Sequence, residues 1–375
     1  TMNIVRNRRS ILPFVLLIGA VLLTGGCSTL GPQSLKGNRI DYNVSIHRSN
    51  NEDLLVNIVR ASCFEPLFFL QVGSVSSSFN YGATVGASGT LYETRSASYA
   101  NMLGASLGAS FSEVPTITYA PLQGQQAMKQ LMSETPIDRI YLLARGGWSI
   151  ASLMWIIVQQ IGPLYNYDAD WKEDHPLVGS YMKFIELTDI WSQMQRRGEL
   201  EFPGLDKDKH DLPIVPVQMV FKNVQDADRV DRLLGVQTVK TSMPDGRLKS
   251  RINLSGRCDT GVTNCVPLRL RSFFGIIYDF ASLGVEQKQA FPWRQLPPRE
   301  LEGRLGTHQG LIKIRTSAVA PAEAYVAVHY RGIWYYIDDN DLVSRGYFTL
   351  IGTLFALQPV DAPMAQPLLT LPVVR

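Results

Sequence analysis

The sequence has few of the residues from which catalytic and metal sites are built. It contains five histidines and four cysteines, and no two histidines stand at metal-ligand spacing. No serine lies in the strand–turn–helix context of a nucleophile elbow. Gly82, Gly86 and Gly89 fall inside a strand pattern, whereas a phosphate-binding loop lies between a strand and a helix. We therefore predict no catalytic residue, no metal and no cofactor, and an enzyme ranks last among the functions considered.

The chain also lacks an excess of charge of one sign. Its formal net charge of +3 arises from 36 basic and 33 acidic residues. Arg6, Arg8 and Arg9 account for the whole excess, so the rest of the chain is balanced. A nucleic-acid-binding domain normally carries a basic patch or stripe. We therefore predict that no nucleic acid is a partner.

No apolar run has the length of an ordinary membrane-spanning helix, which needs about 20 residues. Residues 11–23 are strongly apolar but too few. Residues 146–167 carry no charge, but glutamines, a glycine and a proline interrupt their second half. We expect Ser149 to cap a fully buried core helix that extends over residues 150–161.

The N-terminal segment has the layout of a secretory signal peptide, because three arginines precede the apolar run. The run ends in Leu23-Thr24-Gly25-Gly26-Cys27. Small residues before a cysteine at this place resemble the lipobox of bacterial lipoproteins. Leu23 lies four places before Cys27, whereas the family prefers three. The resemblance covers residues 1–27 and does not extend into the body.

The resemblance implies that residues 1–26 are a lipoprotein signal peptide and that Cys27 is lipid-modified, with palmitate among its acyl chains. Residues 27–39 are then a lipidated tether. The residue after Cys27 is Ser28, not Asp, which in the enteric sorting rule implies the outer membrane. The body then faces the periplasm, with the lipid bilayer as its first partner. The alternative is an ordinary secretory signal in which Cys27 is incidental.

Two further cysteines bracket a short polar loop. Cys258 and Cys265 enclose residues 259–264, and in an oxidising compartment this spacing predicts a local disulfide at a hairpin end. A metal site is disfavoured because no histidine lies in the segment. Cys63 is left over beside an apolar run, and we expect it to be a buried small residue.

Residues 71–112 carry only two charges, Glu93 and Arg95, and 22 of their 42 residues are Gly, Ala or Ser. This composition is typical of a flexible linker. Larger residues nevertheless recur at every second position on both sides of the charged centre, and period two predicts strands. We predict a β-hairpin over residues 74–112 with arms of about 15 residues. Its in-phase positions are Val75, Phe79, Tyr81, Val85, Tyr99, Leu103, Leu107 and Phe111.

The predicted hairpin has three interpretations. A membrane-spanning strand needs about 9–11 residues, so the arms are long enough to cross a bilayer with the in-phase positions toward lipid. One hairpin has open edges, which lipid does not tolerate, so copies from other subunits are then required. This arrangement resembles, in architecture and without a shared motif, the lipoprotein channels of curli secretion. The alternatives are a long soluble ribbon and a mobile Gly/Ser-rich insertion.

The rest of the chain predicts an α+β body with several amphipathic helices. We expect a helical and β domain that contains the hairpin over residues 40–201, and a smaller α+β domain over residues 214–357. The charged, proline-containing stretch 202–213 is the candidate boundary. Residues 358–375 contain three prolines and are expected to form an extended arm.

Several helix ends follow from local sequence. Ser49, with Glu52 three residues on, forms a capping box that predicts a helix from there to about residue 61. Thr135 is a second predicted N-cap. Residues 268–283 are apolar at helical spacing and predict a further helix.

Six aromatic residues lie in or after a tight hairpin that we predict about Arg331 and Gly332. They are Tyr325, Trp334, Tyr335, Tyr336, Tyr347 and Phe348. One interpretation is a binding platform for a peptide or a glycan. The favoured one is that alternate members pack inward and the others lie at an oligomer interface, because aromatic residues often fill cores.

These patterns lead to two main functional hypotheses. The leading one is a lipid-anchored outer-membrane protein that forms a homo-oligomer through its hairpin, with a secretion or translocation pore as the product. The second is a scaffold lipoprotein, a subunit of an envelope complex that binds other envelope proteins without forming a pore.

Overall fold

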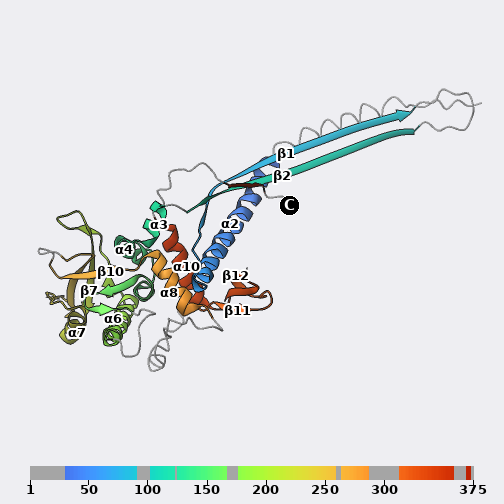
Figure 1. The fold of residues 1–375 in the computed structure, drawn as a ribbon. Coiled ribbons are helices and arrows are strands. Elements are labelled where there is room, and N and C mark those ends of the chain that lie inside the picture. The colour runs from blue at the N-terminus through green and yellow to red at the C-terminus, as the bar shows by residue number, and fades with distance from the viewer. Residues whose placement is uncertain are drawn as a thin grey trace, which may run out of the picture. The chain divides into compact units, whose positions relative to one another are not determined.

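The computed structural model describes residues 30–90, 102–122, 125–166, 176–258, 263–286, 312–358 and 369–372 (Figure 1). The chain divides into two compact units, Thr1–Glu52 and Asp53–Arg375. Its helices are α2 (Leu30–Ser62), α3 (Gln125–Met132), α4 (Asp138–Arg145), α5 (Ile150–Ile157), α6 (Val178–Arg196), α7 (Val224–Leu234), α8 (Phe273–Gly284) and α10 (Leu342–Ala356). Together with three sheets, they confirm the predicted α+β class.

The described part of the first unit is helical, because α2 begins at Leu30. The predicted helix start at Ser49 is therefore wrong. A capping box needs the Glu52 side chain at the backbone N–H of Ser49, but this carboxylate instead accepts a hydrogen bond from Arg48 Nε at 2.9 Å. The expected tether over residues 27–39 is likewise helical from Leu30 onward.

The predicted hairpin is present and is longer than expected. Strands β1 (Leu70–Thr90) and β2 (Met102–Pro121) pair antiparallel along their whole length (Figure 1). At the usual rise per residue each arm is roughly 70 Å long. The excess arises because β1 begins at Leu70 and β2 continues to Pro121, beyond the predicted range of 74–112. A third strand, β14 (Leu369–Pro372), pairs with β2 and realises part of the expected extended arm.

The largest sheet has eight strands in the order β4-β3-β10-β9-β7-β5, and β6 and β8 pair with β7 and β9. Its strands are β3 (Val158–Ile161), β4 (Leu164–Tyr165), β5 (Leu200–Glu201), β6 (Asp206–Lys207), β7 (Pro213–Phe221), β8 (Thr241–Ser242), β9 (Leu248–Ser255) and β10 (Cys265–Leu270). β3 and β10 are hydrogen-bonded neighbours, so one sheet joins segments on both sides of the expected boundary at residues 202–213. Instead of separating two domains, this stretch contributes β6 to the sheet.

Two predicted helices are shorter because each borders on a strand. The helix expected over residues 150–161 ends at Ile157, and Val158 begins β3. The helix expected over residues 268–283 begins at Phe273, because residues 268–270 complete β10. A short apolar run does not distinguish a buried strand from a buried helix by its periodicity. As predicted, α5 is buried almost throughout.

The predicted N-cap at Thr135 is also wrong. Its hydroxyl donates to the Arg271 carbonyl at 2.7 Å, and α4 begins only at Asp138. By contrast, the Asp341 side chain accepts a hydrogen bond from the Ser344 N–H and caps α10.

The third sheet has the order β11-β13-β12, formed by β11 (Arg315–Ser317), β12 (Ala324–Tyr330) and β13 (Ile333–Asp338). The predicted turn between β12 and β13 is confirmed. Arg331 and Gly332 both have positive φ, 48° and 81°, which is typical of a two-residue type I′ turn.

Candidate functional site: the hairpin and its base

The chain enters β1 along the C-terminal part of α2, where Asn57 takes the place of a neighbouring strand. Its buried side chain pairs with the Phe68 backbone in both directions. Nδ2 donates to the Phe68 carbonyl at 2.8 Å, and the Phe68 N–H donates to Oδ1 at 2.7 Å. Nδ2 also donates to the Asp53 carbonyl at 2.8 Å. Both amide donors and the acceptor are therefore used, and this fixes the backbone two residues before the hairpin.

Asp53 lies one helical turn before Asn57 and reaches the first residue of β1. Its Oδ2 accepts a long hydrogen bond of 3.4 Å from the Leu70 N–H. Burial raises the pKa of this carboxyl to about 6, although the Leu70 bond and the charge of Arg60 act in the opposite direction. The hairpin base thus contains a group that changes charge near pH 6.

Phe69 anchors the same entrance in the core. Its side chain is 2% exposed, and its ring centroid lies 4.9 Å from that of Phe355 on α10 and 5.8 Å from that of Phe273 on α8. On the other arm, the Leu122 N–H donates to the Phe69 carbonyl at 2.9 Å. The β1–β2 pairing therefore continues into the apolar core. Neither Asn57 nor Phe69 was predicted as a site residue, although an asparagine in the apolar stripe of α2 was a visible signal.

The strand register aligns the in-phase positions of the two arms. Val75 pairs with Ile117, Phe79 with Glu113, Tyr81 with Phe111, Val85 with Leu107, and Leu103 with Gly89. Tyr99 lies outside the described residues. The alternation in the two arms is thus matched position by position, which is the arrangement that a hairpin with two distinct faces requires.

The edges of this sheet are mostly open. Among the described strands, β1 pairs only with β2, and β14 covers β2 only at residues 116–119. Residues 77–90 of β1 and 102–115 of β2 therefore have no described strand on their outer sides. In an antiparallel pair, alternate backbone N–H and C=O groups point away from the partner. Such a row is a template for another strand, so this stretch is the candidate functional site.

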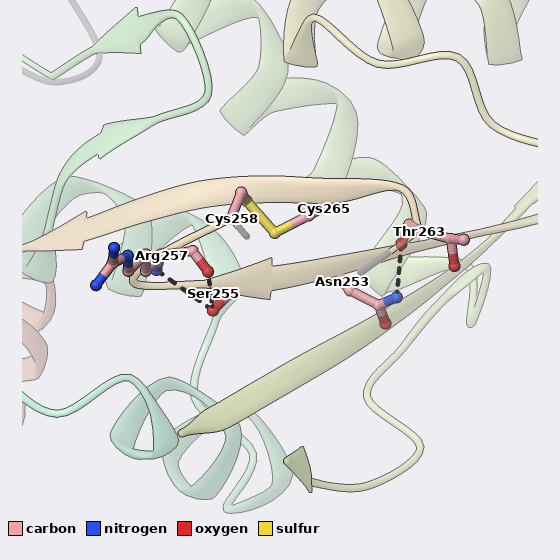
Figure 2. The surroundings of a disulfide bond; sticks show 6 residues. All are labelled: Asn253, Ser255, Arg257, Cys258, Thr263 and Cys265. Atoms are coloured by element: carbon pink, nitrogen blue, oxygen red, sulfur yellow. Dashed lines mark hydrogen bonds between the residues drawn. A yellow bond between two sulfur atoms is a disulfide. The ribbon is translucent and has the colours of Figure 1, made fainter. Parts of the chain in front are cut away.

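The predicted disulfide is present at the start of β10 (Figure 2). Cys258 and Cys265 are joined with Cα atoms 5.6 Å apart. On one side Ser255 Oγ donates to the Arg257 carbonyl at 2.9 Å, and on the other Asn253 Nδ2 donates to the Thr263 carbonyl at 2.9 Å. β9 and β10 pair in parallel, so the hairpin predicted at this place is wrong. These bonds and the disulfide instead hold the connection between two parallel neighbours. The arrangement is a structural staple.

The aromatic cluster comes from the third sheet and from α10, which carries Tyr347 and Phe348, and it divides between the core and the outer face of the sheet. Tyr325, Tyr335, Tyr347 and Phe348 pack in or against the core, as the favoured interpretation predicts. Trp334 and Tyr336 on β13 are half-buried, and their partners on β12 are His329 and Ala327, respectively. The rings of His329 and Trp334 lie 5.1 Å apart. The outer face therefore presents an aromatic pair beside an exposed histidine.

Two buried polar networks were not predicted. At the end of α5, Asn166 Nδ2 donates to the Val158 carbonyl at 2.8 Å, and the Arg271 guanidinium donates to the Trp155 carbonyl at 3.0 Å. Near the end of α7, the Asp231 carboxylate accepts from the Thr238 N–H at 2.9 Å and from Lys240. Each network satisfies groups that would otherwise be buried without partners, so both stabilise the fold.

The other predicted site residues are placed as follows. Cys63 is half-buried rather than buried, and its N–H bonds to the last turn of α2. Cys27 and the signal segment lie outside the described residues. Within the described ranges, no group of three potential ligand side chains is placed to hold a metal ion.

No helix within those ranges combines the length and the apolar character needed to cross a membrane. The chain matches no protein-family model, no curated protein and no solved structure.

Proposed function

We propose that this chain is a lipid-anchored protein of the bacterial outer membrane whose copies assemble through the β1–β2 hairpin. Closure of the shared sheet would form a secretion or translocation pore. The observation that carries the proposal is the pair of open edges along residues 77–90 and 102–115. An isolated two-stranded hairpin is at best marginally stable in water, and further strands are one means of stabilising such an element.

The membrane part of the proposal depends on the N-terminal sequence. Three arginines, an apolar segment and Cys27 after two glycines are the parts of a lipoprotein signal. A lipid on Cys27 would hold every copy at one surface and so raise the local concentration of hairpins. The arms also exceed the roughly 10 residues that a membrane-spanning strand requires.

The second candidate, a scaffold subunit of an envelope complex, is favoured by a different observation. Trp334 and Tyr336 lie on the outer face of the third sheet beside His329. Aromatic residues are enriched in protein interfaces because they bury a large area and still offer a polar group. A partner protein at this face would not require hairpins to join.

The deciding experiment is the mass of the detergent-extracted native particle, measured by light scattering. A ring-sized mass of many chains is expected. The matched control replaces residues 77–115 by an Asn-Gly turn, which leaves the Ser76–Thr116 pair and β14 in place. This variant should remain folded by circular dichroism and have the mass of one or two chains. A native particle of one or two chains would reject hairpin assembly and favour the scaffold.

A further inference from the structure

The inner end of the hairpin sheet has a protected edge on each side. On β2, residues 116–119 are covered by β14, which pairs Leu369 with Tyr119 and Pro372 with Thr116. β14 ends at this proline, which has no N–H to donate. The next residue of β2 toward the tip is Pro115, which cannot donate either. Two prolines, one on each strand, thus mark the limit of the intramolecular pairing among the described residues.

The opposite edge is irregular at the same level. The register of β1 shifts between Val72 and Ser74, which pair with Tyr119 and Thr118. Gly73 is therefore an extra residue in β1, a β-bulge, directly across β2 from β14. Bulges and covering strands are two of the devices by which proteins prevent strand pairing at an edge. Both edges carry such a device at this one level.

Toward the tip these devices are absent from the described strands. Residues 77–90 and 102–115 pair with each other without a register shift. They contain no lysine and no arginine, and Glu113 is their single charged residue. Their one proline, Pro115, stands at the inner end. A long edge without such devices is a template for pairing with another strand, so the protection of this edge only at its inner end is informative.

Strand direction shows how strand β1 of a second copy would fit this edge. β1 and β14 both run antiparallel to β2, so β14 runs in the direction of β1. A β1 strand from a second copy, added antiparallel to the outer edge of β2, would therefore lie in line with β14. It would occupy the outer edge of β2 from the point at which β14 ends. The sequence offers the same low-charge, alternating pattern on both surfaces, which suits pairing between copies.

We propose that the outer edge of β2 over residues 102–115 receives strand β1 of a second copy, and that β14 sets the inner limit of this pairing. This inference rests on the proposed assembly through hairpins and adds which edges meet and what stops them. β14 thereby prevents neighbouring hairpins from sliding toward the body, and it defines one register for every contact in a ring.

Cysteine cross-linking in the full-length, lipid-anchored chain tests the proposal. In a Cys63→Ser background, one tagged copy carries Ser110→Cys, in the open part of β2, or Thr118→Cys, under β14. A second, differently tagged copy carries single cysteines at successive positions of β1, residues 70–90. Ser110→Cys should form interchain disulfides with a narrow set of β1 positions. Thr118→Cys should form none, but should link within one chain to Thr370→Cys, its partner in the register.

Removal of β14 pairing should then expose the inner edge. Adjacent residues in a strand direct their N–H groups to opposite sides, so the double variant Thr370→Pro/Leu371→Pro removes the bond to β2 whichever residue makes it. In this variant Thr118→Cys should gain interchain links to β1. The control Thr370→Val/Leu371→Val keeps both N–H groups and should leave Thr118→Cys without such links.

The outcomes separate the two proposals. Equal interchain linking at Ser110→Cys and Thr118→Cys in the otherwise unaltered chain would overturn the role of β14. A ring-sized particle without any β2–β1 link would overturn the edge assignment while leaving assembly intact. A particle of one or two chains without links would overturn both.

Discussion

Asn57 and Phe68, eleven positions apart, form a two-way hydrogen-bonded pair at the entrance to the hairpin. We predict that Asn57→Leu lowers the free energy of unfolding by about 2–4 kcal/mol. Leucine has nearly the same size, but it leaves the N–H and carbonyl of the partly buried Phe68 without a side-chain partner. Urea denaturation followed by circular dichroism measures the change.

The matched control for this substitution is Asn43→Leu on the exposed surface of the same helix. It should change the free energy of unfolding by no more than about 0.5 kcal/mol, as is usual for surface positions. Equal losses in both variants would mean that the bonds to Phe68 do not account for the effect, because leucine is the better helix former and propensity alone would give a gain.

The carboxyl of Asp53 predicts a pH dependence of stability. Its pKa is about 6 in the folded chain and takes the ordinary value of 3.8 when the chain unfolds. Between these values the folded state binds more protons, so the contribution of Asp53 is present below about pH 4 and is lost as pH rises through 6. With allowance for partial solvent exposure, the loss amounts to about 1–2 kcal/mol.

The variant Asp53→Asn isolates the contribution of Asp53 to the pH dependence of stability, because an amide does not titrate. The variant should gain stability relative to the unaltered chain between pH 4 and pH 7, as measured by urea midpoints in matched buffers. Subtracting the free energy of unfolding of the unaltered chain from that of the variant at each pH removes the contribution of every other carboxyl group. A difference that stays constant with pH, or that falls as pH rises, would show that Asp53 is not the responsible group.

The long hairpin was predictable because its signal is local: period two persists over each arm, and no competing helical period exists. Its full length was not, since residues 70–74 lack a clear alternation and owe their strand form to their partners, and Pro115 separates the alternating residues 116–119 from the second arm. β14 was beyond prediction for the same reason. Four residues that include Pro372 have little strand propensity of their own, and the edge of β2 supplies the reason for their conformation.

The transition from α5 to β3 illustrates a second limit. Residues 150–161 are apolar almost throughout, so burial on all sides is evident, but the choice between helix and strand is not. In the structure the helix gives way to a strand at Val158, where the pairing of β3 with β10 begins. The role of Asn57 was closer to prediction, because a polar residue in an apolar helical stripe signals a buried hydrogen-bond partner.

Loss of the disulfide should destabilise the chain. The joined cysteines are seven positions apart. Closure of so short a loop restricts the unfolded chain by an amount worth about 2–3 kcal/mol. We predict this loss for Cys258→Ser/Cys265→Ser, measured by urea denaturation. Reductant should lower the stability of the unaltered chain and of Cys63→Ser equally, and should leave the double variant unaffected. If the effect of reductant vanished in Cys63→Ser, it would arise from Cys63 and not from the Cys258–Cys265 disulfide.

Cys27→Ser tests the lipid anchor separately from the hairpin. A serine cannot accept the lipid, so the protein should move from the membrane fraction to the soluble fraction after cell disruption. The control is Cys63→Ser, which also removes a thiol and should remain in membranes. Unchanged fractionation of Cys27→Ser would refute the lipobox interpretation, and the shared hairpins would then have to account for any membrane attachment.

Arginine substitutions test whether the in-phase positions contact lipid. If they do, Val85→Arg and Leu103→Arg each place a charge in the bilayer, at an expense of about 2–4 kcal/mol near mid-depth. Both variants should fail to form the ring-sized particle in membranes. Thr84→Arg is the matched control, because Thr84 is adjacent to Val85 in the opposite phase and its position is exposed. Conductance in planar bilayers should persist for Thr84→Arg and disappear for the other two. Normal assembly of all three would place the shared sheet in water, as a ribbon between copies, because an aqueous sheet accommodates arginine on either face.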